Sequence, residues 1–244
     1  MAVDTTIIVI KHDSKNIIMK NAQSMSMLRL WQLISPALPV GAYAYSQGLE
    51  YALHVEWIAE EDDVKQWIQG QVCHSLCHLD IPVLKRLYQA WLENNEDDVK
   101  QWSQFLIASR ESSELVAEDQ QLGRALAVLL SDLGFRSAQE YKQSNTACFA
   151  TLLSLAAVEW KISIEEIAHG YLWAWLENQV AAAIKLVPLG QTAGQRILLS
   201  VSEDIPGAVE VGLKIEDEDI GMLAPMVSIA SALHETQYSR LFRS

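Results

Sequence analysis

Apolar residues recur at spacings of three and four through most of the chain, as on one face of an α-helix. After the acids Glu61–Asp63, for example, they fall at Val64, Trp67, Ile68, Val72, Leu76 and Leu79. Similar patterns predict helices over residues 28–34, 46–55, 82–91, 97–109, 114–133, 146–160, 164–186, 188–201 and 221–238. Strand-like residues are confined to positions 5–10. The pattern predicts an all-α, single-domain bundle of roughly eight to ten helices joined by short connections.

Two prolines indicate where predicted helices end or begin. Pro36 should end the first helix, because the residue before a proline leaves the helical region, and Pro188 suits the first position of a helix. Residues 203–219 are expected to form a loop or a short helix.

The segment E-D-D-V-K-Q-W occurs at 61–67 and again at 96–102. A third copy is absent, so ordinary helix-start composition is favoured over a repeat array.

Length and charge limit the functional class. The 244 residues suit one or at most two domains. A formal net charge of −13 argues against nucleic-acid and anionic-membrane partners. Three cysteines without scaffold-like spacing indicate reduced thiols and a cytoplasmic location. No apolar run is long enough to span a membrane. We expect residues 1–24 to be a disordered tail and residues 25–244 to form the domain.

Enzyme signatures are missing from the sequence. Neither a phosphate-binding glycine loop nor a G-x-S-x-G nucleophile turn occurs, which predicts a protein without catalytic activity or a bound cofactor. One cluster could attract zinc or nickel: Cys73, His74, Cys77 and His78. On a helix, however, the two cysteines and the two histidines would point about 100° apart. Buried cysteines are also common core residues, so no metal site is predicted.

A proline-rich loop offers a candidate recognition surface. Pro36, Pro39 and Gly41 precede a group of polar and aromatic side chains at Tyr43, Tyr45, Ser46, Gln47 and Glu50. A stiff loop with tyrosines and a carboxylate suits protein recognition. It could equally plug the bundle, with its hydroxyl groups satisfied internally.

Several other polar residues allow either a structural or a binding role. Lys185 complements a helix dipole at the end of an apolar helix. Gln191 and Gln195 project amides from one helical face, which suits capping or partner contact equally. Glu111, Glu114 and Glu118 are interpreted first as a solvated helix face.

The last eleven residues, 234–244, are unusually rich in anchoring side chains. Chain ends often fray, yet this one carries two aromatics and two arginines, the residue types that dominate protein interfaces: Tyr238, Phe242, Arg240 and Arg243. The segment is either a docking tail or a final turn folded onto the protein's own core.

Four motifs together resemble the UreF family of urease accessory proteins. They are S-P-A-L-P-V-G-A-Y-A-Y-S-Q-G-L-E at 35–50, R-E-S-S-E-L-V-A-E-D-Q-Q-L-G at 110–123, K-L-V-P-L-G-Q-T-A-G-Q at 185–195 and H-E-T-Q-Y-S-R-L-F-R-S at 234–244. The likeness runs from about Leu28 to Ser244 in family order. Ala232–Leu233 depart from the family pattern, in which many members have a basic residue at the second position.

The resemblance implies a homodimeric, non-catalytic assembly factor for nickel insertion into apo-urease. Such proteins link a UreD/UreH-type scaffold to a UreG-type GTPase and couple their binding. Carried onto this chain, the resemblance assigns partner contacts to Tyr43, Ser46, Gln47, Glu50, Lys185, Gln191, Gln195, His234, Glu235, Tyr238, Arg240 and Arg243. A helical metal carrier using Cys73, His74, Cys77 and His78 is the alternative.

Overall fold

The computed structural model describes residues 23–221 and 224–244 of the chain. In this part every regular element is helical, which confirms the all-α prediction. After a helix over residues 23–33, the α-helices are α2 (Leu49–His54), α3 (Glu61–Gly70), α4 (Asp80–Leu92), α5 (Glu96–Ala108), α6 (Ser113–Asp132), α7 (Phe149–Glu159), α8 (Ile164–Leu186), α9 (Gln191–Ser202), α10 (Ile205–Gly212) and α11 (Pro225–His234). Three 3-10 helices are η1 (Ala42–Ala44), η3 (Arg136–Gln143) and η4 (Asp217–Asp219), and η2 (Gln71–Leu76) is a π-helical turn.

Local sequence fixes the starts of several helices. Ser163 and Glu166 form a capping box at the start of α8, which satisfies main-chain N–H groups that otherwise have no partner. Ser112 accepts a hydrogen bond from the main chain of Leu115 at the start of α6. Such caps explain why these two helices begin within a residue of their predicted positions.

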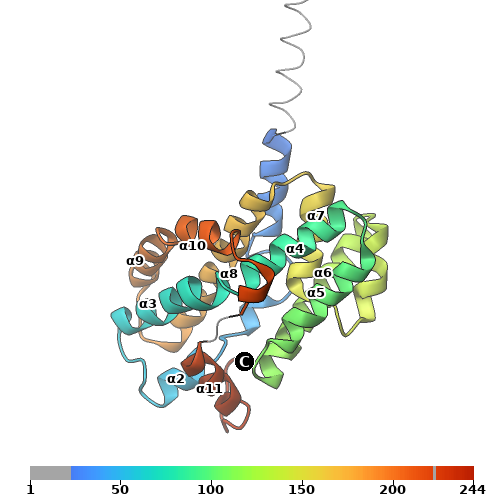
Figure 1. Ribbon diagram of the computed structural model, residues 1–244. Helices are drawn as coiled ribbons and strands as arrows, with labels where there is room; N and C mark the ends of the chain where they lie inside the picture. The colour runs from blue at the N-terminus through green and yellow to red at the C-terminus, as the bar shows by residue number, and fades with distance from the viewer. Residues whose placement is uncertain (1–22, 222–223) are drawn as a thin grey trace, which may run out of the picture.

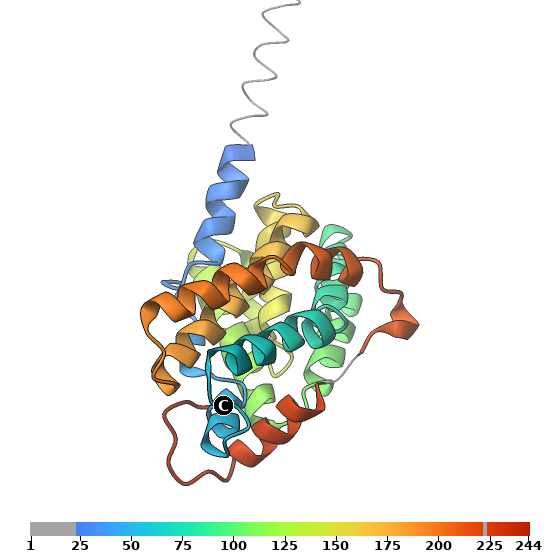
Figure 2. The ribbon, with the colours of Figure 1, turned by 90° about the vertical axis from the view of Figure 1, so that its left-hand side faces the viewer.

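Helix α8 forms the centre of the bundle. It packs against α2, α3, α4, α7, α9 and α10 (Figure 1), and ten of its residues are buried. On its other side, α7 packs against α4 and α6. The helix over residues 23–33 stands out from one end of the bundle, while α2 and α11 lie together at the other end (Figure 2).

Two predicted helix boundaries were wrong. The helix of residues 61–79 ends as α3 at Gly70 and continues as a π-helical turn, η2. Pro188 does not start α9, because Val187 before it is extended and the helix begins at Gln191. For residues 203–219, the predicted alternative of a short helix agrees with the structure, which has α10 and the turn η4 there.

The predicted N-terminal tail, residues 1–24, lies mostly outside the described part of the chain. Of the expected tail, residues 1–22 lie outside the described part, whereas residues 23 and 24 are helical. None of the described helices combines the length and apolar character needed to cross a bilayer.

Gly123 of α6 permits a close approach between helices. A Cβ atom at this position would lie 2.4 Å from the carbonyl oxygen of Ala147, just before α7. We expect Gly123→Ala to lower the free energy of unfolding by about 1–3 kcal/mol, because backbone cannot move aside cheaply. Chemical denaturation measures this. The matched control is Gly207→Ala in α10, where the new Cβ meets no atom within 4 Å; it should be neutral or slightly stabilising. Equal effects of the two changes would contradict the packing argument.

Candidate functional site

The C-terminal residues fold back along the proline-rich loop. Ser46 donates two hydrogen bonds to the main-chain oxygen of Ser244, from its N–H at 2.8 Å and from its hydroxyl at 2.5 Å. The N–H of Arg243 donates to the carbonyl of Ala44 at 2.9 Å. In Figure 2 the C-terminus accordingly lies beside α2. Two motifs almost 200 residues apart in sequence therefore form one structural unit.

Glu50, in the first turn of α2, holds this returning segment. Its carboxylate is buried and accepts the main-chain N–H groups of Leu241 at 2.6 Å and Phe242 at 2.9 Å. The imidazole Nε2 of His234 lies 3.2 Å from the same carboxylate. Hydrogen bonds to a charged acceptor are roughly twice as strong as neutral ones. Glu50 therefore fixes both the end of α11 and the tail.

A second carboxylate extends this arrangement. Glu114 of α6 lies 2.7 Å from Nδ1 of His234 and accepts a bond of 2.7 Å from Arg240. The fully buried imidazole therefore bridges Glu50 and Glu114. We call Glu50, Glu114, His234 and Arg240 the tail clasp.

Glu118, one turn further along α6, holds the last residue. Its carboxylate accepts from Ser244 Oγ at 2.9 Å and from Gln47 Nε2 at 2.8 Å. Trp175 Nε1 of α8 donates to the other side of the Gln47 amide at 2.8 Å. Burial raises the pKa of Glu118 to about 7, despite the two hydrogen bonds that favour its charged form.

The main chain just before α2 adopts left-handed conformations. Gln47 and Gly48 have φ angles of 52° and 80°, a region that glycine enters at little cost. A Cβ on Gly48 would also lie 2.9 Å from the main-chain nitrogen of Ser231 in α11. Gly48 therefore permits the close packing of α2 on α11.

Lys185 reaches the same region from the end of α8. Its ammonium lies 5.6 Å from the ring centre of Phe242 and 6.0 Å from that of Tyr43. Both distances suit a cation–π interaction. The structure thus brings the loop, the end of α8 and the tail together.

The tail itself has two faces. Phe242 and Ser244 are buried, so part of the tail does pack on the protein's own core. Tyr238 is fully exposed and Leu241 is 66% exposed. In the preceding helix α11, three apolar residues at helical spacing are 41–49% exposed: Met226, Ile229 and Leu233. These five residues form what we call the tail surface.

The remaining predicted contacts lie elsewhere or have another role. Gln191 and Gln195 are exposed on α9, and no described hydrogen bond joins them to the clasp. Glu235 accepts from the N–H and the hydroxyl of Ser113 at 2.8 and 2.7 Å. It thus caps α6, and this structural role explains the glutamate without a contact to another protein.

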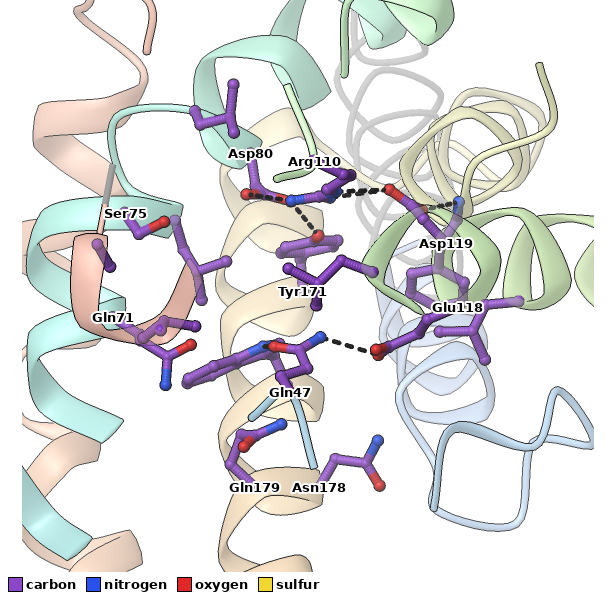
Figure 3. A pocket seen from close by; sticks show the side chains of 18 of the residues that line it. Gln47, Gln71, Ser75, Asp80, Arg110, Glu118, Asp119, Tyr171, Asn178 and Gln179 are labelled. Carbon is purple, nitrogen blue, oxygen red and sulfur yellow. Dashed lines mark hydrogen bonds and ion pairs between the residues drawn. The ribbon is translucent and has the colours of Figure 1, made fainter. Parts of the chain in front are cut away.

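Next to the clasp lies a cavity of about 140 Å³ (Figure 3). Its lining includes Gln47, Glu118, Gln71 and Gln179. Nε2 of Gln71 and Oε1 of Gln179 are buried without a hydrogen-bond partner. Glu118 lines the cavity and also binds Ser244, and Gln47 binds Glu118. A shift of the tail would therefore alter the cavity wall.

A buried ionic cluster closes the other side of this cavity (Figure 3). Arg110 donates to Asp80 at 2.6 Å and to Asp119 at 3.0 Å, and Tyr171 donates to Asp80 at 2.7 Å. Asp119 also accepts the N–H of Phe149 at 2.8 Å. The cluster joins α4, α6, α7 and α8, so its charges are used to hold the bundle together.

The cysteine and histidine cluster shows a different arrangement from the α-helical one expected. The π-helical turn η2 contains Cys73 and His74, and Cys77 and His78 follow it. Cys77 Sγ lies 2.8 Å from His78 Nδ1, and burial raises the pKa of Cys77 to about 11. A protonated thiol is a poor metal ligand. Among the described residues, no three His, Cys, Asp or Glu side chains are placed to hold a metal ion together.

The interpretation of α6 as carrying a solvated acidic face was wrong. Glu118 is buried and Glu114 is only 11% exposed, because both bind the tail. Their partners lie more than 100 residues away in sequence, so local periodicity could not reveal the contacts. The only available signal was the co-occurrence of the 110–123 motif with the tail motif.

The clasp predicts the effect of a nearly isosteric change. We expect Glu50→Gln to lower the free energy of unfolding by about 1–3 kcal/mol, because an amide offers one acceptor where the tail presents two buried N–H groups. Denaturation monitored by circular dichroism measures this. Glu216→Gln, at an exposed carboxylate before η4, is the control and should change little. A fully stable Glu50→Gln protein would show that the carboxylate does not hold the tail.

The sequence is similar to known proteins of one family. A model of the UreF family matches residues 58–202. The urease accessory protein UreF of Alkalilimnicola ehrlichii is 53% identical over 220 residues, covering 90% of this chain and 96% of the relative. That of Teredinibacter turnerae is 50% identical over 218 residues, covering 89% and 98%. The chain therefore belongs to the UreF family of urease accessory proteins.

Proposed function

We propose that this protein is a non-catalytic adaptor for the assembly of the urease metallocentre. It acts in the cytoplasm as a homodimer. It links a UreD/UreH-type scaffold to a UreG-type GTPase and promotes nickel insertion into apo-urease. Family membership supports the link to urease, and the tail surface supports the role of an adaptor.

The observation that carries this proposal is the two-faced tail. Glu50 fixes the tail backbone, while Tyr238 and Leu241 remain exposed in the segment that follows the partly exposed apolar residues of α11. Large exposed apolar groups rimmed by polar residues mark protein–protein contacts. A surface held rigid before binding also loses less conformational entropy when a partner docks.

The adaptor acts by coupling binding free energies. A partner bound at the tail surface contacts residues that are fixed to α2, α6 and the end of α8. A second partner that contacts Lys185 or Tyr43 would touch groups that are linked to Phe242 of the tail through the cation–π contacts of Lys185. Binding of one partner can thereby change the affinity for the other, which is what a regulated assembly needs.

Partner capture tests the proposal. We expect Tyr238→Ala combined with Leu241→Ala to weaken capture of the scaffold or the GTPase by roughly thirtyfold, the effect of losing about 2 kcal/mol at an interface anchor. The melting temperature should stay unchanged, because both side chains are exposed. A pull-down with purified urease maturation proteins measures this. The control is Leu199→Ala on α9, an equally exposed leucine away from the tail. Full capture of both partners by the double variant would contradict the role of the tail surface.

The metal-carrier alternative has its own test. We expect Cys73→Ser combined with Cys77→Ser to leave urease activation within about twofold of the parent, because protonated thiols bind metal poorly. Urease activity after co-expression of the maturation proteins measures this, with a melting curve to check the fold. A stably folded double variant that no longer supports nickel loading would favour the carrier instead.

A further inference from the structure

The cavity beside the tail clasp is lined by buried amides that the fold leaves unpaired. Gln71 of η2 and Gln179 of α8 are only 4% and 1% exposed. Within the described part of the chain, neither Nε2 of Gln71 nor Oε1 of Gln179 has a hydrogen-bond partner. Asn178 adds a third amide to the lining, and all three lie on the side away from the ionic cluster (Figure 3). Burying an amide group without a partner costs free energy, so these atoms indicate a ligand that would pair with them.

The buried charged groups of the cavity wall are already paired. Arg110 donates to both Asp80 and Asp119, and these carboxylates also accept from a tyrosine hydroxyl and a main-chain N–H. The carboxylate of Glu118 accepts from an amide and from a hydroxyl. Three carboxylates face a single guanidinium here, so no positive charge remains for an anion. The groups of the wall that need a partner are therefore the neutral amides.

The unpaired amide atoms define the chemistry of the ligand. An amide has a donor end and an acceptor end whichever way its head group is turned. A ligand that pairs with Gln71 and Gln179 must therefore both donate and accept hydrogen bonds. A cation cannot accept from the buried N–H group, and an anion would only accept, next to three carboxylates. Small carboxamides and urea are neutral and combine N–H donors with a carbonyl acceptor in one planar molecule.

We propose that this cavity binds a small neutral molecule of the carboxamide or urea class, held between Gln71 of η2 and the amides of α8. The cavity volume of about 140 Å³ is sufficient, because an apolar cavity of roughly this size accepts a molecule as large as benzene. The site is additional to the proposed adaptor role and does not depend on it.

Titration of the full chain with acetamide, followed by NMR, tests the site. The side-chain NH₂ signals of Gln71 and Gln179 report directly on their pairing. We expect saturable shifts in the millimolar range, because a ligand of so few atoms binds no tighter than roughly tens of micromolar. Urea should compete with acetamide. Acetate and acetamidinium have nearly the same shape but carry a charge, and each should bind at least about tenfold more weakly.

Two variants test the roles of the amides. Gln71→Met and Gln179→Met keep the length of the side chain and remove its hydrogen-bonding groups. Each should weaken acetamide binding by about tenfold, the effect of losing one buried hydrogen bond. Both proteins should melt at or above the temperature of the parent, because an unpaired buried group has been removed. Gln101→Met, at an exposed glutamine of α5, is the control and should bind acetamide like the parent.

The contrary results are equally clear. If neither acetamide nor urea gives saturable shifts in the parent protein, water alone pairs with the amides and the proposed site is wrong. Acetate or acetamidinium binding as tightly as acetamide would overturn the neutral ligand class. Unchanged acetamide affinity in both methionine variants would overturn the assignment to this cavity. Capture of the urease maturation proteins is a separate measurement, so each of these failures leaves the adaptor role standing.

Discussion

The conformation of the C-terminal segment depends on one buried carboxylate, that of Glu50. A charge removed from water is costly unless its hydrogen-bonding capacity is used. Here two main-chain N–H groups donate to the carboxylate, and Nε2 of His234 lies 3.2 Å from it. The dependence is mutual. Without the tail, Glu50 loses partners in a buried site, and without Glu50, the N–H groups of Leu241 and Phe242 have none. The loop and the tail are therefore stable only together.

This mutual dependence explains how a short terminal segment can pack on the core and still present exposed side chains in a fixed position. Phe242 and Ser244 face inward, whereas Tyr238 and Leu241 face solvent. Because Glu114 and Glu118 hold the tail from α6, the exposed residues have a fixed position relative to the bundle. The folded-back turn accounts for the residues that face inward, and a docking role for the residues that face solvent stays a prediction.

Sequence periodicity predicted the helices well where local signals agreed. Both ends of α8 were placed correctly, because Ser163 caps its start and Pro188 closes its end. It failed at residues 71–79, since the switch from α3 to a π-helical turn has no local signature. It also failed for Glu114 and Glu118. A carboxylate that faces water and one that faces a distant tail have the same spacing on a helix, so only the three-dimensional contacts distinguish them. The family motifs marked the loop and the tail but did not show that they touch.

Hydrogen exchange of the tail amides in the free protein tests the central claim most directly. If Glu50 fixes the tail, the N–H groups of Leu241, Phe242 and Arg243 should exchange slowly, because each is hydrogen bonded in the fold. The neighbouring amides of Tyr238 and Ser239, in the exposed turn, should exchange much faster. Equally fast exchange from Tyr238 through Ser244 would show that the tail is not held in the free protein and would contradict this account.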